Sequence, residues 1–259
     1  MSNAMPVPNL LVRRWRNVWQ LLSLFQSPVE LAKCAKTVLA GAGAAPVRLR
    51  LKNHGGFSVL CRPGTTDFGT LLSVFAAGYH LPPVPVMPGG VIVDLGSNVG
   101  YTLIDFAKRF PGTRLIGVEL DGENCRVALE TLSLAGVSCA VLHAAVWTSD
   151  GTISYGGAAA DAFSVAQSGG GAHEAAAISL PTLLERYNIE SVDYLKVDIE
   201  GAEREIFTGP LGWAAKVKSM KIEIHRPEDF AVIEQRLRDV GFSTRKDSAH
   251  WSAIVAERD

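Results

Sequence analysis

The chain has 259 residues, of which 47% are hydrophobic and 20% are charged, values that suit one α/β domain with an additional N-terminal segment. Its formal net charge of -1 excludes a general electrostatic attraction to nucleic acid, so no nucleic-acid partner is expected. The four cysteines are scattered without a Cys-x-x-Cys pair, which predicts reduced thiols in the cytoplasm and excludes a zinc knuckle or a disulfide framework.

The sequence pattern of residues 5–88 predicts an N-terminal segment of helices and one hairpin. Ser2-Asn3-Ala4 before Met5 is typical of an expression-vector remnant, so residues 1–4 are not expected to take part in function. Apolar residues recur at helical spacing over 10–25 beside three arginines. This favours a helix docked on the main domain or on a second subunit of a homodimer; the alternative is peripheral contact with a membrane or a lipid-linked substrate. Further along, the patterns predict helices over 28–39 and 66–79, strands over 48–51 and 57–61, and a proline-rich end at 82–88.

Residues 89–259 alternate between strand and helix patterns, which predicts a mainly parallel sheet with helices on both faces. The expected strands are 91–94, 114–118, 138–143, 194–197 and 220–224, the expected helices are 99–109, 124–135, 202–207 and 227–240, and an antiparallel pair at 242–246 and 251–256 closes the chain. Ligands of such sheets bind at the carboxyl ends of the strands.

The segment 151–177 is rich in Gly, Ala and Ser and reads as a long, weakly structured insertion. Insertions of this kind either cover an active site or are disordered. Tyr155, Asp161, Phe163 and His173 are its candidate substrate contacts.

A glycine-punctuated turn follows the first strand of the sheet. Gly96 and Gly100 remove side chains where a ligand approaches the backbone, and the next helix begins with N–H groups that have no partner within it. Asp94 adds an anionic acceptor, whereas a phosphate cradle would need donors and cations. The turn therefore predicts a ligand with a cationic end and hydroxyls, which describes S-adenosylmethionine.

The ends of the next two strands add residues suited to a nucleoside. Glu119 lies about 25 residues after Asp94, a usual place for an acid that binds ribose hydroxyls; the alternative is an ordinary acid at a helix N-terminus. Ala144 and Ala145 would lie against the adenine, or could be ordinary packing.

Acidic residues gather at the ends of the fourth and fifth strands. Strand alternation puts Lys196 and Asp198 on one face, and Glu200 follows directly. Carboxylates this close repel unless a cation or a donor-rich ligand lies among them; the alternative is a plain ion pair with acids at a helix N-terminus. Glu223 and His225 share a face of the fifth strand, and they converge on Asp198 if the two strands are neighbours.

The chemistry of this cluster has three interpretations. Asp198, Glu223 and His225 could hold a divalent cation that helps to deprotonate a substrate hydroxyl. Alternatively, His225 is a general base oriented by Glu223, or the residues form a polar network that shapes a pocket. Acid–base chemistry or substrate binding is favoured over a metal.

Four motifs together resemble the FkbM-type methyltransferases: Asp-x-Gly-x-Asn-x-Gly at 94–100, Glu119, Lys-x-Asp-x-Glu-Gly-x-Glu at 196–203 and Glu-x-His at 223–225, with 62–67 similar to an upstream family segment. The resemblance covers roughly residues 57 to 256. It implies a Rossmann-like class I methyltransferase sheet of seven strands, mostly parallel with a C-terminal antiparallel hairpin. It also implies an S-adenosylmethionine-dependent O-methyltransferase acting on a hydroxyl of a sugar, glycolipid or secondary metabolite. The chain departs from the family where Glu119 is followed by Leu120 and not by proline.

The resemblance also implies the roles of individual residues. Asp198 would lie between cofactor and acceptor, surrounded by Lys196, Glu200, Glu223 and His225. The cofactor-binding residues would be Asp94, Gly96, Ser97, Asn98, Gly100, Tyr101, Glu119, Leu120, Ala144 and Ala145.

Two other functions use similar patterns. A nicotinamide-dependent oxidoreductase predicts a Gly-x-Gly-x-x-Gly turn, which this chain lacks. A non-catalytic binding module predicts a broken cofactor motif, whereas the motif here is intact.

Overall fold

The computed structural model describes residues 24–25, 27–41, 43–156, 164–166, 173–248 and 250–258. The chain divides into two compact units, 1–78 and 79–259. Apart from Leu24 and Phe25, which are buried, the predicted helix over 10–25 lies outside the described residues. Among the residues that are described, no helix is long and apolar enough to cross a membrane.

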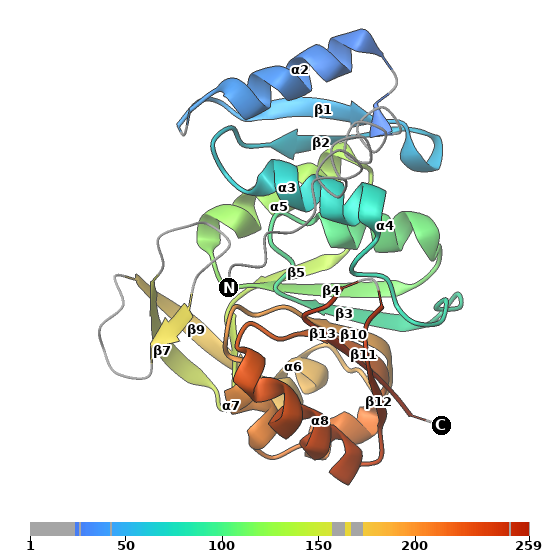
Figure 1. Ribbon diagram of the computed structural model, residues 1–259, viewed down its shortest axis with the longest axis vertical. Coiled ribbons are helices and arrows are strands. Elements are labelled where there is room, and N and C mark those ends of the chain that lie inside the picture. Colours follow the sequence, from blue (N-terminus) through green and yellow to red (C-terminus); the bar gives the residue numbers. More distant parts are fainter. Residues whose placement is uncertain are drawn as a thin grey trace, which may run out of the picture. The chain divides into compact units, whose positions relative to one another are not determined.

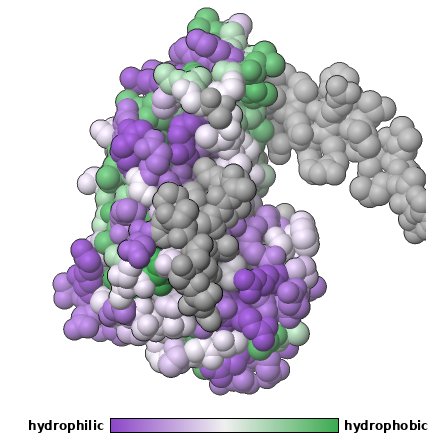
Figure 2. All heavy atoms as spheres, turned by 90° about the vertical axis from the view of Figure 1, so that its left-hand side faces the viewer, coloured by the Kyte–Doolittle hydropathy of each residue, from purple (hydrophilic) through white to green (hydrophobic). Residues whose placement is uncertain are grey.

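The first unit contains the predicted helix and hairpin. Its elements are α2 (Pro28–Leu39), β1 (Val47–Leu51), β2 (Phe57–Cys61), α3 (Asp67–Leu72) and a π-helical turn at Ser73–Ala77. Helix α2 begins where the Ser27 side chain accepts a hydrogen bond from the Glu30 N–H, with proline at the first helical position. Strands β1 and β2 pair antiparallel, as predicted. Helix α2 exposes Val29, Val38 and Leu39, and Figure 2 shows apolar side chains among hydrophilic ones there.

The second unit is built on the predicted seven-stranded sheet (Figure 1). Its strands, in spatial order, are β12 (Ser243–Lys246), β13 (Ala253–Glu257), β11 (Val217–Glu223), β10 (Val192–Val197), β3 (Val91–Leu95), β4 (Arg114–Glu119) and β5 (Ala140–His143). The five strands from β11 to β5 are parallel, and β13 runs antiparallel to both β11 and β12.

Helices cover both faces of this sheet, as Figure 1 shows. Helices α4 (Tyr101–Arg109) and α5 (Gly122–Leu134) lie on one face, and α6 (Leu180–Arg186), α7 (Glu203–Thr208) and α8 (Phe230–Asp239) lie on the other. Strand alternation decides which side chains meet which layer. Val93 and Leu195 join the apolar core with Phe207 of α7. Asp94 and Lys196 are opposite each other on neighbouring strands and point to the α4 side.

The expectation that 151–177 is weakly structured is wrong for its described parts. They form strands β7 (Gly151–Gly156), β8 (Ser164–Ala166) and β9 (His173–Ser179) of a four-stranded sheet, together with β6 (Ala145–Trp147). The strands were missed because the segment is rich in small residues, a composition that is typical of a linker. Two of these small residues, Ala175 and Ala177, are nevertheless buried in β9. Neither β6 nor α6 was predicted.

Of the candidate substrate contacts in this segment, Tyr155 is the one whose side chain the structure describes. Tyr155 is buried in β7, on the side of Glu119 and Asp121. Asp161 and Phe163 lie outside the described residues, and only the backbone of His173 is described.

Candidate active site

The glycine turn brings two strand ends into backbone contact. Gly96 has a φ of +78°, and a Cβ atom placed on it would lie 1.8 Å from the Asp198 carbonyl oxygen. At Gly100, with a φ of +81°, a Cβ atom would lie 3.3 Å from the Ala128 Cβ atom of α5. From the sequence, both glycines are expected to admit a ligand. In the structure the chain's own atoms occupy the space that a Cβ atom would take, so Gly96 allows Asp198 to lie against the turn, and ligand approach to the two glycines stays a prediction.

The turn also carries polar groups without partners. Ser97 Oγ and Asn98 Oδ1 are buried and make no hydrogen bond. Helix α4 begins at the turn without a side-chain cap, which leaves N–H groups of its first turn unpaired within the helix. Buried polar groups normally have partners. These orphaned atoms therefore fit a polar ligand that would bind at the turn.

Glu119 is fixed at the end of β4 by three hydrogen bonds. Its carboxylate accepts from the Asn98 N–H at 2.8 Å, the Asp121 N–H at 2.9 Å and the Asn124 side-chain amide at 3.3 Å. Burial raises the pKa of Glu119, and these hydrogen bonds oppose that rise. A carboxylate has about four lone-pair positions, so Glu119 keeps acceptor capacity for a ribose hydroxyl. Asp121, and not Glu119, caps α5 by accepting from the Asn124 N–H.

The remaining predicted cofactor residues lie around this edge. Ala144 and Ala145 are buried directly after β5, and the Ala144 N–H donates to the Glu119 carbonyl oxygen. The Leu120 carbonyl oxygen lies 3.0 Å from His143 Nε2, and Tyr101 is buried at the start of α4.

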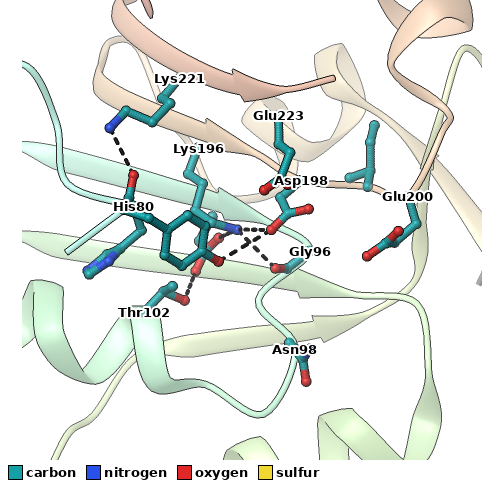
Figure 3. Close-up of polar contacts among 12 residues, drawn as sticks. His80, Gly96, Asn98, Thr102, Lys196, Asp198, Glu200, Lys221 and Glu223 are labelled. Atoms are coloured by element: carbon teal, nitrogen blue, oxygen red, sulfur yellow. Dashed lines mark hydrogen bonds and ion pairs between the residues drawn. The ribbon is translucent and has the colours of Figure 1, made fainter. Parts of the chain in front are cut away.

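Lys196 is the central cation of the site. Its Nζ lies 3.2 Å from Asp94 Oδ1, 3.2 Å from the Gly96 carbonyl oxygen and 3.3 Å from Asp198 Oδ2 (Figure 3). Burial alone would lower the pKa of Lys196, but Asp94, Tyr79 and Asp198 hold it well above its usual range. Thr102 donates a hydrogen bond to the other oxygen of Asp94, which is fully buried. Asp94 therefore anchors Lys196, and through it Asp198.

His225 is held by carboxylates on both sides of its ring. Its Nδ1 lies 2.8 Å from Glu203 Oε1, and its Nε2 lies 3.3 Å from Glu200 Oε2 and 3.6 Å from Asp198 Oδ1. The carboxylate that orients His225 is therefore Glu203 of α7, and not Glu223 as the sequence interpretation has it. Burial alone would lower the pKa of His225, but the hydrogen bond and charge of Glu203, with Glu200 and Asp198, raise it to about 9.

The geometry also regroups the candidate metal ligands. Among the residues that the structure describes, ligand atoms of Asp198, Glu200 and His225 lie within 4.8 Å of one another, close enough to share one ion. Glu223 is not in this group. A divalent cation held by these three residues stays a prediction beside acid–base chemistry and substrate binding.

A small pocket opens beside Asp198, at the ends of β10 and β11. It is lined by Tyr79, His80, Lys196, Val197, Asp198, Lys221, Glu223, His250 and Ala253. Burial and the neighbouring Asp198 raise the pKa of Glu223 to about 7. The Tyr79 hydroxyl donates to Asp198 Oδ2 at 3.4 Å, and Lys221 donates to the Tyr79 carbonyl oxygen at 2.9 Å (Figure 3).

Tyr79 and His250 were not predicted from the sequence. Tyr79 precedes the proline-rich stretch and belongs to no motif. His250 reaches the pocket because β13 runs antiparallel to β11 with Ala253 opposite Glu223, which brings the turn before β13 to the carboxyl end of β11. One sequence signal could have found His250: it lies just before the antiparallel closing strand, and residues in that place lie at the carboxyl ends of the parallel strands.

The strand order and the carboxyl-edge site define a Rossmann-like enzyme of the class I methyltransferase type. The Methyltransferase FkbM domain matches residues 94–244, more than half of the chain, and the chain therefore belongs to the FkbM methyltransferase family. It is an S-adenosylmethionine-dependent methyltransferase, which decides against the nicotinamide-dependent and non-catalytic alternatives.

The solved structures to which the chain is similar include two methyltransferases and the protein TrmN. Precorrin-6y C5,15-methyltransferase from Geobacter metallireducens GS-15 has 10% identity and a TM-score of 0.42, over 67% of this chain and 83% of that one. TrmN from Thermus thermophilus has 16% identity and a TM-score of 0.44, over 79% of this chain and 57% of that one. The tRNA (uracil-54, C5)-methyltransferase of Pyrococcus abyssi, solved with S-adenosyl-L-homocysteine, has 16% identity and a TM-score of 0.44, over 83% of this chain and 44% of that one. No curated protein matches the chain by sequence.

Proposed function

We propose that the enzyme transfers the methyl group of S-adenosylmethionine to a hydroxyl of a sugar, a glycolipid or a secondary metabolite. The observation that supports this acceptor is the pocket beside Asp198. It is lined by the carboxylates of Asp198 and Glu223, the phenol of Tyr79 and the imidazole of His250. These groups hydrogen-bond hydroxyls well, and Asp198 and Glu223 can orient a polyol at two points.

The chain has a suitable place for the cofactor. Ser97, Asn98 and the start of α4 would hold its methionine end, since Ser97 Oγ and Asn98 Oδ1 lack partners in the protein and α4 has no side-chain cap. Glu119 would hold the ribose, and Ala144 with Ala145 would lie against the adenine. When bound, S-adenosylmethionine supplies an electrophilic methyl group on a sulfonium.

The protein's part in the reaction is alignment and removal of one proton. An in-line displacement gains most from holding the acceptor oxygen at the correct angle and distance. Asp198 is suited to this role, because Lys196 and Tyr79 fix one of its oxygens from two sides. The acceptor hydroxyl must also lose its proton as the new bond forms, which requires a base in the pocket.

The decisive experiment is a search for products one methyl group heavier across a panel of sugars, glycolipids and hydroxylated metabolites. We expect at least one hydroxyl compound to be methylated, with the position shown by NMR of the product. Methylation confined to nitrogen or carbon atoms would contradict the proposal. Isothermal titration with S-adenosylmethionine, S-adenosylhomocysteine and NAD provides the cofactor control.

We further propose a cytoplasmic enzyme that forms a homodimer through residues 10–25. All four cysteines lie in the described part of the chain and none forms a disulfide, which agrees with a reducing compartment. Light scattering of the full chain and of a variant lacking residues 1–26 tests the dimer. Liposome co-sedimentation that depends on the same segment would favour peripheral membrane contact instead.

A further inference from the structure

Two histidines flank Asp198, and their surroundings differ. Both ring nitrogens of His225 face carboxylates, as described above. The Nδ1 atom of His250 lies 3.0 Å from Ser252 Oγ, and its Nε2 lies 3.7 Å from Glu223 Oε1. The second distance is beyond the range of a direct hydrogen bond. His250 therefore presents Nε2 near Glu223 without a short contact to it.

The two rings also differ in their relation to the pocket. His250 lines it together with Asp198, Glu223 and Tyr79, whereas His225 does not. The Tyr79 and His250 rings lie with their centroids 5.5 Å apart. A hydroxyl bound next to Asp198 would thus meet His250 and Glu223 from the side of β11 and β13.

We propose that His250 Nε2 accepts the proton of the acceptor hydroxyl and that Glu223 stabilises the resulting imidazolium. This inference rests on the proposed O-methyl transfer. As the oxygen–carbon bond forms and the carbon–sulfur bond breaks, the hydroxyl proton passes to His250. The products are a methyl ether and a neutral thioether, and the positive charge leaves as the proton that His250 later releases to water.

The surroundings of the His250 ring agree with this role. Burial lowers the pKa of His250, so the ring is neutral near pH 7. Ser252 can accept from Nδ1–H, a tautomer that leaves the lone pair on Nε2. His225 does not line the pocket, and both of its ring nitrogens face carboxylates. The charged groups that face His250 are Asp198, Glu223, His225, Lys221 and Asp247.

The first test needs no acceptor. Nitrogen-15 NMR of the histidine rings, on enzyme saturated with S-adenosylhomocysteine, reports charge and tautomer directly. His250→Gln and His225→Gln identify the two signals. We expect His250 to be neutral at pH 7.5 with its proton on Nδ1. A charged His250, or a proton on Nε2 of the neutral ring, would overturn the assignment.

The second test uses the first acceptor found in the product screen. His250→Gln is expected to lower kcat by about 100-fold or more, the usual contribution of a general base, and to remove the acidic limb of the pH–rate profile. Its dissociation constant for S-adenosylhomocysteine should not change. Ser252→Ala should lower kcat less, since it removes the hydrogen-bond partner of His250 Nδ1 but leaves the base itself in place. If His250→Gln keeps the wild-type rate and pH profile while product still forms, His250 is not the base although O-methylation stands.

Discussion

Replacing Gly96 with alanine tests the contact between the glycine turn and Asp198. The new Cβ atom would lie 1.8 Å from the Asp198 carbonyl oxygen, whereas real Cβ contacts are not found below 3.0 Å. The backbone at Asp198 would therefore have to retreat by more than 1 Å. A rotamer change cannot relieve this clash, because the facing atom belongs to the main chain.

The cost has two parts. A left-handed conformation costs a non-glycine residue roughly 1–2 kcal/mol, and Gly96 has a φ of +78°. Retreat of Asp198 also strains the hydrogen bond from its N–H to the Leu95 carbonyl oxygen at 3.0 Å, and the contact with Lys196. Losing one such hydrogen bond costs about 1 kcal/mol, and disturbing a buried ion pair costs more. We expect a total loss of about 3–5 kcal/mol in the free energy of unfolding.

Gly136→Ala is the matched control. Gly136 also has a positive φ, of +65°, but a Cβ atom added there would have no described atom within 4 Å, so only the conformational cost applies. Urea unfolding of wild type and both variants measures the difference. Where the Gly96→Ala protein still folds, turnover should fall by about 100-fold, since a displacement of 1 Å at the reacting centre can cost this much. Equal destabilisation by the two substitutions would refute the proposed contact.

Four further results are expected. Asp198→Asn should lower kcat far more than it weakens S-adenosylhomocysteine binding; equal losses would place Asp198 in cofactor binding. Lys196→Met should cost about 3–5 kcal/mol in urea unfolding, because it leaves Asp94 buried without its cation, and Asp94→Asn in the same chain should recover part of that loss. His225 has a folded pKa of about 9 against 6.5, so its stabilisation is complete below pH 6.5 and is lost as pH rises through 9. Wild type, but not His225→Gln, should therefore lose about 3 kcal/mol between about pH 6 and about pH 10. Activity should survive EDTA; abolition by EDTA and recovery with Mg²⁺ or Mn²⁺ would show that an ion binds after all.

The sequence alone was sufficient for the parts of this protein that depend on local pattern. Buried strands and amphipathic helices leave a periodic hydrophobic signal, so the seven-stranded sheet and most of its helices were predicted near their observed bounds. The motif at 94–100 and the acids near 198 were placed at the carboxyl ends of strands, because that edge follows from the alternation of strands and helices. The prediction for segment 151–177 was wrong because strand pairing there depends on distant partners, and because its small residues carry little periodic hydrophobic signal.

Which residues touch at the site was decided only by tertiary structure. The pairing of His225 with Glu203 depends on how α7 packs beside β11, and the presence of His250 in the pocket depends on β13 returning antiparallel to β11. The role of Gly96 became clear only when Asp198 was found against it, about one hundred residues further along the chain. These contacts join segments far apart in sequence. Strand order and register set them, and neither composition nor local spacing encodes those two quantities.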